Sequence, residues 1–543
     1  MSNNKVLTPG DAFFLLIESD KTPSQIGSLA RMKLPPGADK NFILDMVEGF
    51  RKYQPAAAPY NLKLAKRTAT NPMYAWETVD RVDINYHLRH SALPYPGGER
   101  ELAILISRLH SIPLDHNRPM WEFHIIEGLE DNCFAIYSKM HHALIDGVAG
   151  SRLLQQWMSQ TEPKVTANFV PFWAMPIPKG KTKLKEHAAQ KAVRRAPKSL
   201  LDKLSGPVKS ALGVFDATLE SILGSRSKKN PNLVAPYSAP ESMLNVPVGP
   251  QRRVSTVAFT TERLLAIGKQ RNGTLNDVVM AICGGALRNY LIEQNALPSK
   301  PLVAQVPVSF RAKDDLGGGN SIGMVLASLG TDESDTLARF DKVKASMSAG
   351  KSLLSKMDAL QITAYSALMT LPFSVGQMTG FGNSKNRPMS NVVISNVPGP
   401  REKRYLNGAE VINVHPVSFV MQGQALNITL FTYADQITFV FTACRESLPS
   451  VQRLVEHTTE ALEALENELH ITNKAPAPKK PVSAKKEPVA TKPKTAKAPA
   501  RKPVAKKPVT KKKSVAKAAP KTAPKPVRSA PSAKTKKAPA TSK

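Results

Sequence analysis

The chain has 543 residues, which is enough for two to four domains with large buried cores. Its formal net charge is +32, but residues 474–543 hold 23 Lys and Arg against the single acid Glu487, so this segment carries about +22 and residues 1–473 about +10. Three scattered cysteines argue against a disulfide framework, and neither a secretory signal nor about 18 consecutive apolar residues occurs, so we expect a cytoplasmic protein without a membrane span.

Residues 1–165 mix helical and strand-like patterns and form the first predicted domain. Residues 41–50 have the apolar spacing of a helix, and residues 133–139 form an apolar run that predicts a strand. Residues 148–158 return to helical spacing. The segment therefore contains both element types.

Residues 166–250 are rich in Pro and Lys and predict a linker. Within it, residues 200–223 contain spaced apolar side chains with lysines at the start, interrupted at Gly206-Pro207. This pattern suits an amphipathic helix on a bilayer or lipid-droplet surface. The alternative is a bridging helix that packs on the two neighbouring domains.

Residues 251–473 predict a second α/β domain. Strands are expected at residues 302–310 and 391–397, the latter ended by Pro398-Gly399-Pro400. The segments 426–430 and 437–441 alternate around Ala434-Asp435, which predicts a hairpin. A buried helix should begin near Asn276-Asp277, and a final helix should cover residues 450–470.

The tract Met140–Gly147 has the form His-His-x-x-x-Asp-Gly at the end of the apolar run. Histidine suits proton abstraction near neutral pH. If the run is a strand, His141 and His142 point to opposite faces, so one is a candidate base and the other is structural. Asp146 either caps the next helix or pairs with an arginine. A merely packed or exposed histidine pair stays open at this point, whereas a metal site is disfavoured because no third ligand recurs at helical spacing.

Other motifs stand around this tract in a fixed order. They are Leu7–Asp11 (LTPGD), Pro113–Glu122 (PLDHNRPMWE), Leu275–Val278 (LNDV), Pro307–Arg311 (PVSFR), Leu316–Asn320 (LGGGN) and Ser395–Pro400 (SNVPGP). With the histidine tract, they make the chain resemble the bacterial wax ester synthase/acyl-CoA:diacylglycerol acyltransferase family over about residues 5–470.

The resemblance implies two chloramphenicol-acetyltransferase-like α/β lobes around a central substrate tunnel. It implies transfer of a fatty acyl group from acyl-CoA to diacylglycerol or a long-chain alcohol, with His142 as general base and no cofactor beyond acyl-CoA as co-substrate. His141, Asp146 and Gly147 complete the implied catalytic tract. The implied enzyme associates peripherally with the inner membrane or lipid droplets.

Three further residues are candidate substrate-binding groups. Asn276 and Ser309 could donate a hydrogen bond to the developing oxyanion, and Asp277 adjoins Asn276. The alternative for Asn276 is a plain helix cap. No phosphate-cradling loop is visible for the CoA diphosphate.

Residues 474–543 are Lys, Ala and Pro with almost no large apolar side chain, which predicts a disordered tail. Nucleic acid, anionic lipid or another polyanion could bind it without sequence preference. Two alternative functions follow: the same fold acylating a non-lipid hydroxyl, or a non-catalytic tether between lipid droplets and nucleic acid. The intact histidine tract speaks against the tether.

Overall fold

The computed structural model divides the chain into a compact unit, Met1–Lys474, and a second unit, Ala475–Lys543. All described residues lie in the first unit. They are 5–55, 57–68, 73–145, 147–161, 165, 169–175, 230–309, 322–357, 361–362, 365, 369, 388–448 and 450–471. The candidate amphipathic helix at 200–223, the LGGGN motif at 316–320 and the basic tail therefore lie outside the described residues. The amphipathic helix and the disordered tail stay predictions.

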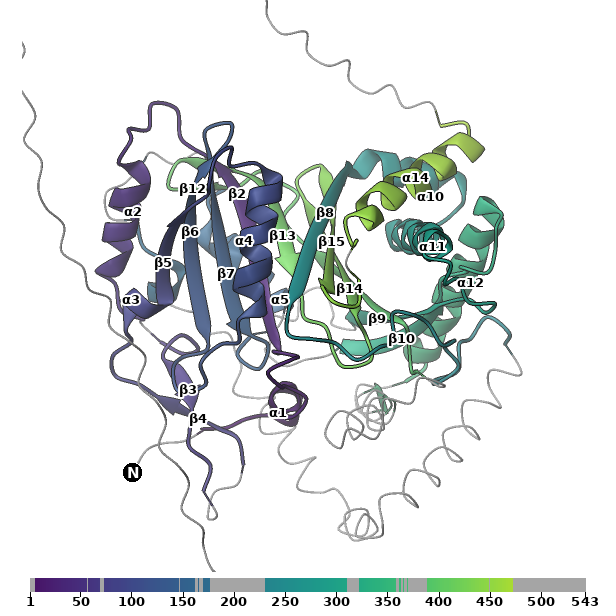
Figure 1. Ribbon diagram of the computed structural model, residues 1–543, viewed down its shortest axis with the longest axis horizontal. Helices are drawn as coiled ribbons and strands as arrows, with labels where there is room; N and C mark the ends of the chain where they lie inside the picture. The colour runs from purple at the N-terminus through teal and green to yellow at the C-terminus, as the bar shows by residue number, and fades with distance from the viewer. Residues whose placement is uncertain are drawn as a thin grey trace, which may run out of the picture. The chain divides into compact units, whose positions relative to one another are not determined.

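The first six-stranded sheet has the order β12-β13-β2-β7-β6-β5 (Figure 1). Its members from the first part of the chain are β2 (Gln25–Lys33), β5 (Leu88–Ala92), β6 (Trp121–Leu129) and β7 (Cys133–His141). β7 is antiparallel to both of its neighbours and buried along its whole length. This central position explains why the sequence of β7 is a nearly continuous apolar run.

The second six-stranded sheet has the order β10-β9-β11-β14-β15-β8. Its strands are β8 (Arg252–Thr260), β9 (Val303–Ser309), β10 (Ile322–Ser328), β11 (Val392–Pro398), β14 (Leu426–Tyr433) and β15 (Gln436–Cys444). The last two form the predicted hairpin, and β9 and β11 confirm the other two predicted strands within one residue at each end. Ile437, Phe439 and Phe441 alternate into the largest core cluster, as expected from their period of two.

Two strands from the second half of the chain complete the first sheet. β13 (Ala409–Val417) pairs antiparallel with β2, and β12 (Tyr405–Leu406) pairs with β13 at the sheet edge. The predicted division at 1–165 and 251–473 stays a prediction about domains, but the first sheet itself combines strands from both segments. A crossing strand of this kind ties the two sheets together through the backbone.

The helices around the second sheet gather on one side of it in Figure 1: α10 (Thr261–Gln270), α11 (Leu275–Glu293), α12 (Thr336–Ser355) and α14 (Arg453–Glu468). α11 is buried almost throughout, and Gly284 faces the Leu329 carbonyl so closely that an added Cβ would lie 2.3 Å from its oxygen. α14 confirms the predicted final helix and buries Leu454, Leu462 and Leu465.

The first sheet is covered by α2 (Phe42–Arg51), which confirms the helix predicted at 41–50, by α3 (Ile84–His87), and by α4 (Glu99–Ser111). A short 3-10 helix η1 (Phe172–Ala174) adds Phe172 and Trp173 to an aromatic cluster around Trp121. α4 also bridges to the second sheet, because the Ser107 and Ser111 hydroxyls accept the backbone N–H groups of Val254 and Arg252 on β8.

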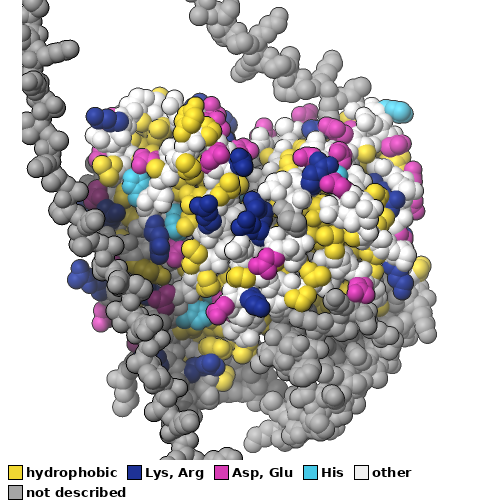
Figure 2. Space-filling view, viewed as in Figure 1, with side chains coloured by type: hydrophobic (Ala, Val, Ile, Leu, Met, Phe, Trp, Pro, Cys, Tyr) yellow, Lys and Arg dark blue, Asp and Glu magenta, His cyan; other side chains and the backbone are white. Residues whose placement is uncertain are grey.

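A small sheet of order β1-β4-β3 stands beside these elements, made of β1 (Lys5–Val6), β4 (Ala75–Thr78) and β3 (Leu62–Leu64). Helix α1 (Pro9–Leu16) packs on it through Leu15, and the same cluster contains Ala143 of the histidine tract. Among the described helices, none has the length and apolar content needed to cross a bilayer. Acidic and basic side chains are interspersed on the face drawn in Figure 2, consistent with the modest net charge of residues 1–473.

Candidate active site

The histidine tract begins at the last residue of β7. His141 follows Tyr137 and Lys139 on one side of the strand, while Met140 contributes to the core on the other side. His142 comes directly after the strand, and its N–H donates to the Ser24 carbonyl at 2.8 Å. The two imidazoles have different surroundings, but only His141 belongs to the strand, so strand alternation alone does not account for the difference.

The His141 ring is fully buried and both of its nitrogens are engaged. Nδ1 accepts the N–H of Ala143 at 3.0 Å, so the ring proton of the neutral form lies on Nε2. Nε2 then donates to the Glu18 carboxylate, 3.2 Å away. These contacts fix both the tautomer and the orientation of this ring, which is the structural part expected of one histidine of the pair.

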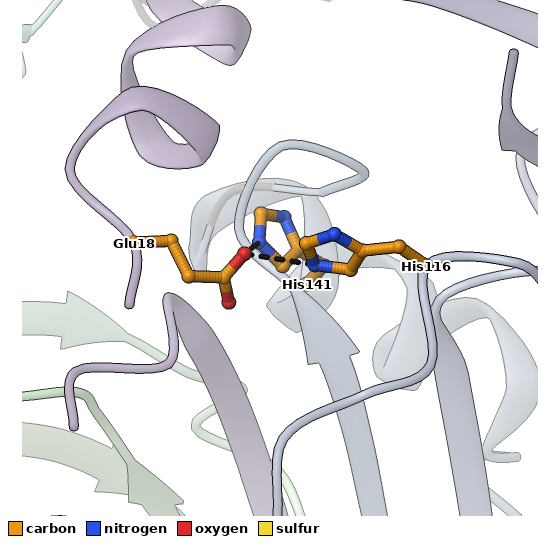
Figure 3. A group of neighbouring side chains, drawn as sticks. All are labelled: Glu18, His116 and His141. Atoms are coloured by element: carbon orange, nitrogen blue, oxygen red, sulfur yellow. Dashed lines mark hydrogen bonds and ion pairs between the residues drawn. The ribbon is translucent and has the colours of Figure 1, made fainter. Parts of the chain in front are cut away.

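The Glu18 carboxylate faces both His141 and His116 (Figure 3). Its Oε2 is 2.8 Å from His116 Nε2, and its other oxygen accepts the Ser24 N–H at 3.0 Å. Burial raises the pKa of the Glu18 carboxyl, but the hydrogen bonds from His116, His141 and Ser24 outweigh burial and bring the pKa to about 2. Its hydrogen bond to Glu18 in turn raises the pKa of His116. Glu18 is therefore ionised at neutral pH.

The His142 ring lies among aromatic side chains. It stacks on Phe14 of α1, with ring centroids 3.8 Å apart and planes inclined by 20°. The His142 ring also makes a T-shaped contact with Phe419, with ring centroids 5.6 Å apart. Phe14 comes from the start of the chain and Phe419 from the segment after β13. Both halves of the sequence therefore orient this imidazole.

A buried chain of hydrogen bonds anchors the residue before Phe419. The Ser418 carbonyl accepts from Nε2 of His110 at 2.8 Å, and His110 Nδ1 accepts the Tyr137 hydroxyl at 2.7 Å. Burial lowers the pKa of His110 to about 3, so this ring is neutral and can act as donor and acceptor at once. Tyr137 reaches it by lying over Gly27 of β2.

Gly147 opens helix α5 (Gly147–Trp157), which confirms the helix predicted after the tract. α5 packs on β11: the Ser151 hydroxyl donates to the Pro398 carbonyl at 3.2 Å, and Val397 Cγ2 lies 3.8 Å from a Cβ built on Gly147. Helix α5, which begins at the last residue of the tract, is thus in contact with the SNVPGP motif. Asp146 lies outside the described residues, and its role stays a prediction.

The predicted substrate-binding residues occupy the second sheet and its helices. Asn276 is in the first turn of α11, but the N-cap is Thr274, so the expected helix cap at Asn276 is displaced by two residues. The buried Asp277 carboxylate accepts the N–H and hydroxyl of Thr274 at 2.8 and 2.7 Å and completes a capping box. Ser309 ends β9, and its side chain is not among those described.

Some of the residues around the histidine tract belong to motifs recognised in the sequence, and others do not. Trp121 is fully buried and donates from Nε1 to the Tyr60 carbonyl at 2.9 Å, and Arg118 pairs with Asp83, consistent with a supporting PLDHNRPMWE motif. Sequence reasoning missed Glu18 and Phe419. His116 stood inside a recognised motif, but no local pattern connects Glu18 or Phe419 to residues more than a hundred positions away.

Two family models match the chain. The wax ester synthase/diacylglycerol acyltransferase catalytic domain matches residues 7–279, and the WS/DGAT C-terminal domain matches residues 318–466. A probable diacylglycerol O-acyltransferase of Mycobacterium tuberculosis is 39% identical over 470 residues, covering 86% of this chain and 100% of that protein. The O-acyltransferase WSD of Acinetobacter baylyi is 38% identical over 466 residues, covering 85% of this chain and 96% of that protein.

Solved structures agree with these matches. The wax ester synthase/diacylglycerol acyltransferase from Marinobacter aquaeolei VT8 is 32% identical, with a TM-score of 0.69 over 86% of this chain and 100% of that one. The first condensation domain of the CDA synthetase is only 14% identical but has a TM-score of 0.52 over 86% of this chain and 97% of that one, which shows a shared fold. The predicted α/β fold class is confirmed.

Proposed function

The chain belongs to the wax ester synthase/diacylglycerol acyltransferase family, and we propose that it moves a fatty acyl group from acyl-CoA to a lipid hydroxyl with His142 as general base. The enzyme class, an O-acyltransferase of storage-lipid synthesis, follows from the family. The assignment of the base rests on the geometry of the histidine tract.

The observation that carries the assignment is the state of the His141 ring. Because Ala143 and Glu18 occupy its two nitrogens in a fully buried site, His141 cannot accept a proton from substrate without breaking that arrangement. His142 is only partly buried and stands at the junction of α1, β7 and the Ser418–Val420 segment. It is the imidazole of the tract placed to meet a substrate.

The chemistry then needs one base and no covalent enzyme intermediate. His142 takes the proton of the acceptor hydroxyl as its oxygen attacks the thioester carbonyl carbon. The tetrahedral intermediate collapses, the carbon–sulfur bond breaks, and the imidazolium returns the proton to the CoA thiolate. Base catalysis of this kind contributes about 10²–10⁴-fold, and holding both substrates together supplies much of the remainder.

The remaining site roles are part of the same proposal. Asp146 orders the loop between His142 and α5, and Gly147 starts that helix beside Val397. Asn276 or Ser309 donates to the oxyanion. Asp277 supports the first turn of α11 through Thr274 and acts on substrate only through that turn. The site needs no metal and no cofactor beyond acyl-CoA.

The proposal also covers the acceptor substrate and the location of the enzyme in the cell. The relatives carry names for both diacylglycerol and wax ester chemistry, so either a diacylglycerol or a long-chain alcohol is a suitable acceptor. We propose peripheral contact with a membrane or lipid droplet, because both acceptors are lipids. The basic tail, with about +22 charges, would add attraction to anionic lipids or nucleic acid.

The test follows CoA release by the purified protein with palmitoyl-CoA and either hexadecanol or diacylglycerol. We expect acceptor-dependent release that falls by about 10²–10⁴-fold in His142→Ala. His90→Ala, on the edge strand β5 and separated from β7 by β6, is the matched control and should retain activity. Release that is equal in His142→Ala and the wild type would contradict the assignment of the base.

A further inference from the structure

The loop between α1 and β2 holds a carboxylate, that of Glu18, which contacts His141 directly and is linked to His142 through the backbone of Ser24. Glu18 begins this loop and is only 10% exposed. The loop closes on itself between Ser19 and Thr22 and is held from the second sheet, because the buried Arg252 guanidinium donates to the Lys21 carbonyl at 2.5 Å. Glu18 is therefore presented on a fixed segment.

Three N–H groups converge on the two oxygens of Glu18. His116 and His141 donate to Oε2, and the Ser24 backbone donates to Oε1. The next link is the Ser24 carbonyl, which accepts the N–H of His142 at 2.8 Å. The carboxylate thus orients the ring of His141 and, through the single residue Ser24, the backbone of His142.

A metal ion is the competing explanation for this cluster. One ligand atom from each of Glu18, His116 and His141 lies within 4.8 Å of the other two. However, the Ala143 N–H points at His141 Nδ1, so Nε2 holds the ring proton and has no lone pair to offer a cation. Metal ligation at Nε2 normally has the opposite pattern, with Nδ1–H donating to an acceptor. The hydrogen bonds favour a positioning cluster over a metal site.

We propose that Glu18 is a positioning residue for acyl transfer, with His116 as its outer partner. As a carboxylate it accepts the Nε2–H of His141, whose tautomer the Ala143 N–H sets, and it fixes the backbone of His142 through Ser24. This proposal rests on the proposed function. A glutamine at position 18 would present one acceptor oxygen and an NH₂ group to three donors, so at least one of the hydrogen bonds is lost.

The kinetic test compares Glu18→Gln with Asp20→Asn, which removes an exposed carboxylate two residues away and serves as the charge-matched control. In Glu18→Gln we expect kcat to fall by about 10–100-fold, while KM for palmitoyl-CoA changes by less than about threefold, because a misplaced base slows the chemical step more than binding. Asp20→Asn should retain the wild-type kcat. Glu18→Asp, which restores the charge on a shorter side chain, should recover part of the loss.

A second readout reports the hydrogen bond between His141 and Glu18. In protein labelled with ¹⁵N-histidine, His141 should show an Nε2–H resonance, identified by its disappearance in His141→Gln. In Glu18→Gln the ¹H shift of this resonance should decrease, because an amide oxygen is a weaker acceptor than a carboxylate. A wild-type kcat or an unchanged Nε2–H resonance in Glu18→Gln would overturn the proposal. If Glu18→Gln does not fold, Glu18→Asp decides: reduced kcat at an unchanged melting temperature supports the proposal, and full kcat overturns it.

The outcomes separate this proposal from the proposed function. A wild-type protein without acceptor-dependent CoA release contradicts the function, whatever Glu18 does. An active wild type with an equally active Glu18→Gln contradicts only the positioning role. Stoichiometric Zn²⁺ retained by dialysed wild type but not by Glu18→Gln, with activity lost to a chelator, would replace the positioning cluster with a metal site.

Discussion

Gly27→Ala should disturb the active site through Tyr137, which shares one face of the first sheet with Gly27 and His141. A Cβ built at Gly27 would lie 2.6 Å from Cε2 and 2.7 Å from the hydroxyl oxygen of Tyr137. Carbon atoms in contact stand about 3.5–4.0 Å apart, so the fully buried tyrosine ring must move by about 1 Å. That movement pulls the hydroxyl away from His110.

The magnitude has two parts. Overpacking a buried site costs about 1–3 kcal/mol of the free energy of unfolding, and weakening the Tyr137–His110 hydrogen bond adds about 0.5–1.5 kcal/mol. We therefore expect about 1.5–4.5 kcal/mol of destabilisation in total. Because His110 also holds the Ser418 carbonyl next to Phe419, the His142 ring loses part of its support, and kcat should fall about tenfold.

Urea unfolding and CoA-release kinetics of the same protein preparation measure both effects. Tyr137→Phe keeps the ring but removes the hydroxyl, so it should cost only about 0.5–1.5 kcal/mol. Gly10→Ala is the matched control, since the nearest described atom, Thr8 Oγ1, is 3.9 Å from its added Cβ. A Gly27→Ala protein within about 0.5 kcal/mol of the wild type and with wild-type kcat would refute the reasoning.

Three further predictions concern other contacts. Gly399→Ala places a Cβ 2.2 Å from the Thr432 carbonyl oxygen, so the midpoint of urea unfolding should fall by the equivalent of about 1–3 kcal/mol. Glu18 raises the pKa of His116 in the folded state, so the His116–Glu18 ion pair contributes fully to stability below about pH 6.5. This contribution is lost as the pH rises through the raised folded-state pKa of His116. In urea unfolding, His116→Gln should therefore destabilise the protein more at about pH 5.5 than at about pH 9. Lys139→Met removes the cation from a buried ion pair and should cost about 3–5 kcal/mol by the same measurement; a change below about 1 kcal/mol would contradict it.

Local pattern was enough to predict elements whose burial follows from their own periodicity. The hairpin of β14 and β15 and the stripe of Leu454, Leu462 and Leu465 on α14 are of this kind. The start of α11 was less accurate, because Thr274 and Asp277 form a capping box and Asn276 does not cap the helix. Neighbouring side chains can compete for such a role, and composition alone does not decide between them.

The histidine tract was predicted correctly as the junction of a strand and a helix. The strand ends at His141, so alternation along it does not determine where His142 points. What could not be predicted is what each ring contacts. Glu18 reaches His141 across 123 positions of sequence, and Phe419 reaches His142 across a still longer separation. These contacts depend on how strands pair across the whole chain, for which short-range periodicity carries no signal.

The late position of β13 has a consequence for synthesis on the ribosome. Until Ala409–Val417 has been made, β2 has β7 on one side and an open edge on the other. An open edge invites pairing with other chains, and long-range closure of a sheet is slow. The nascent protein must therefore carry an incomplete sheet through most of its translation. We therefore expect that the protein needs chaperones during expression. We also expect that fragments ending before β13 do not fold, because β13 completes the first sheet.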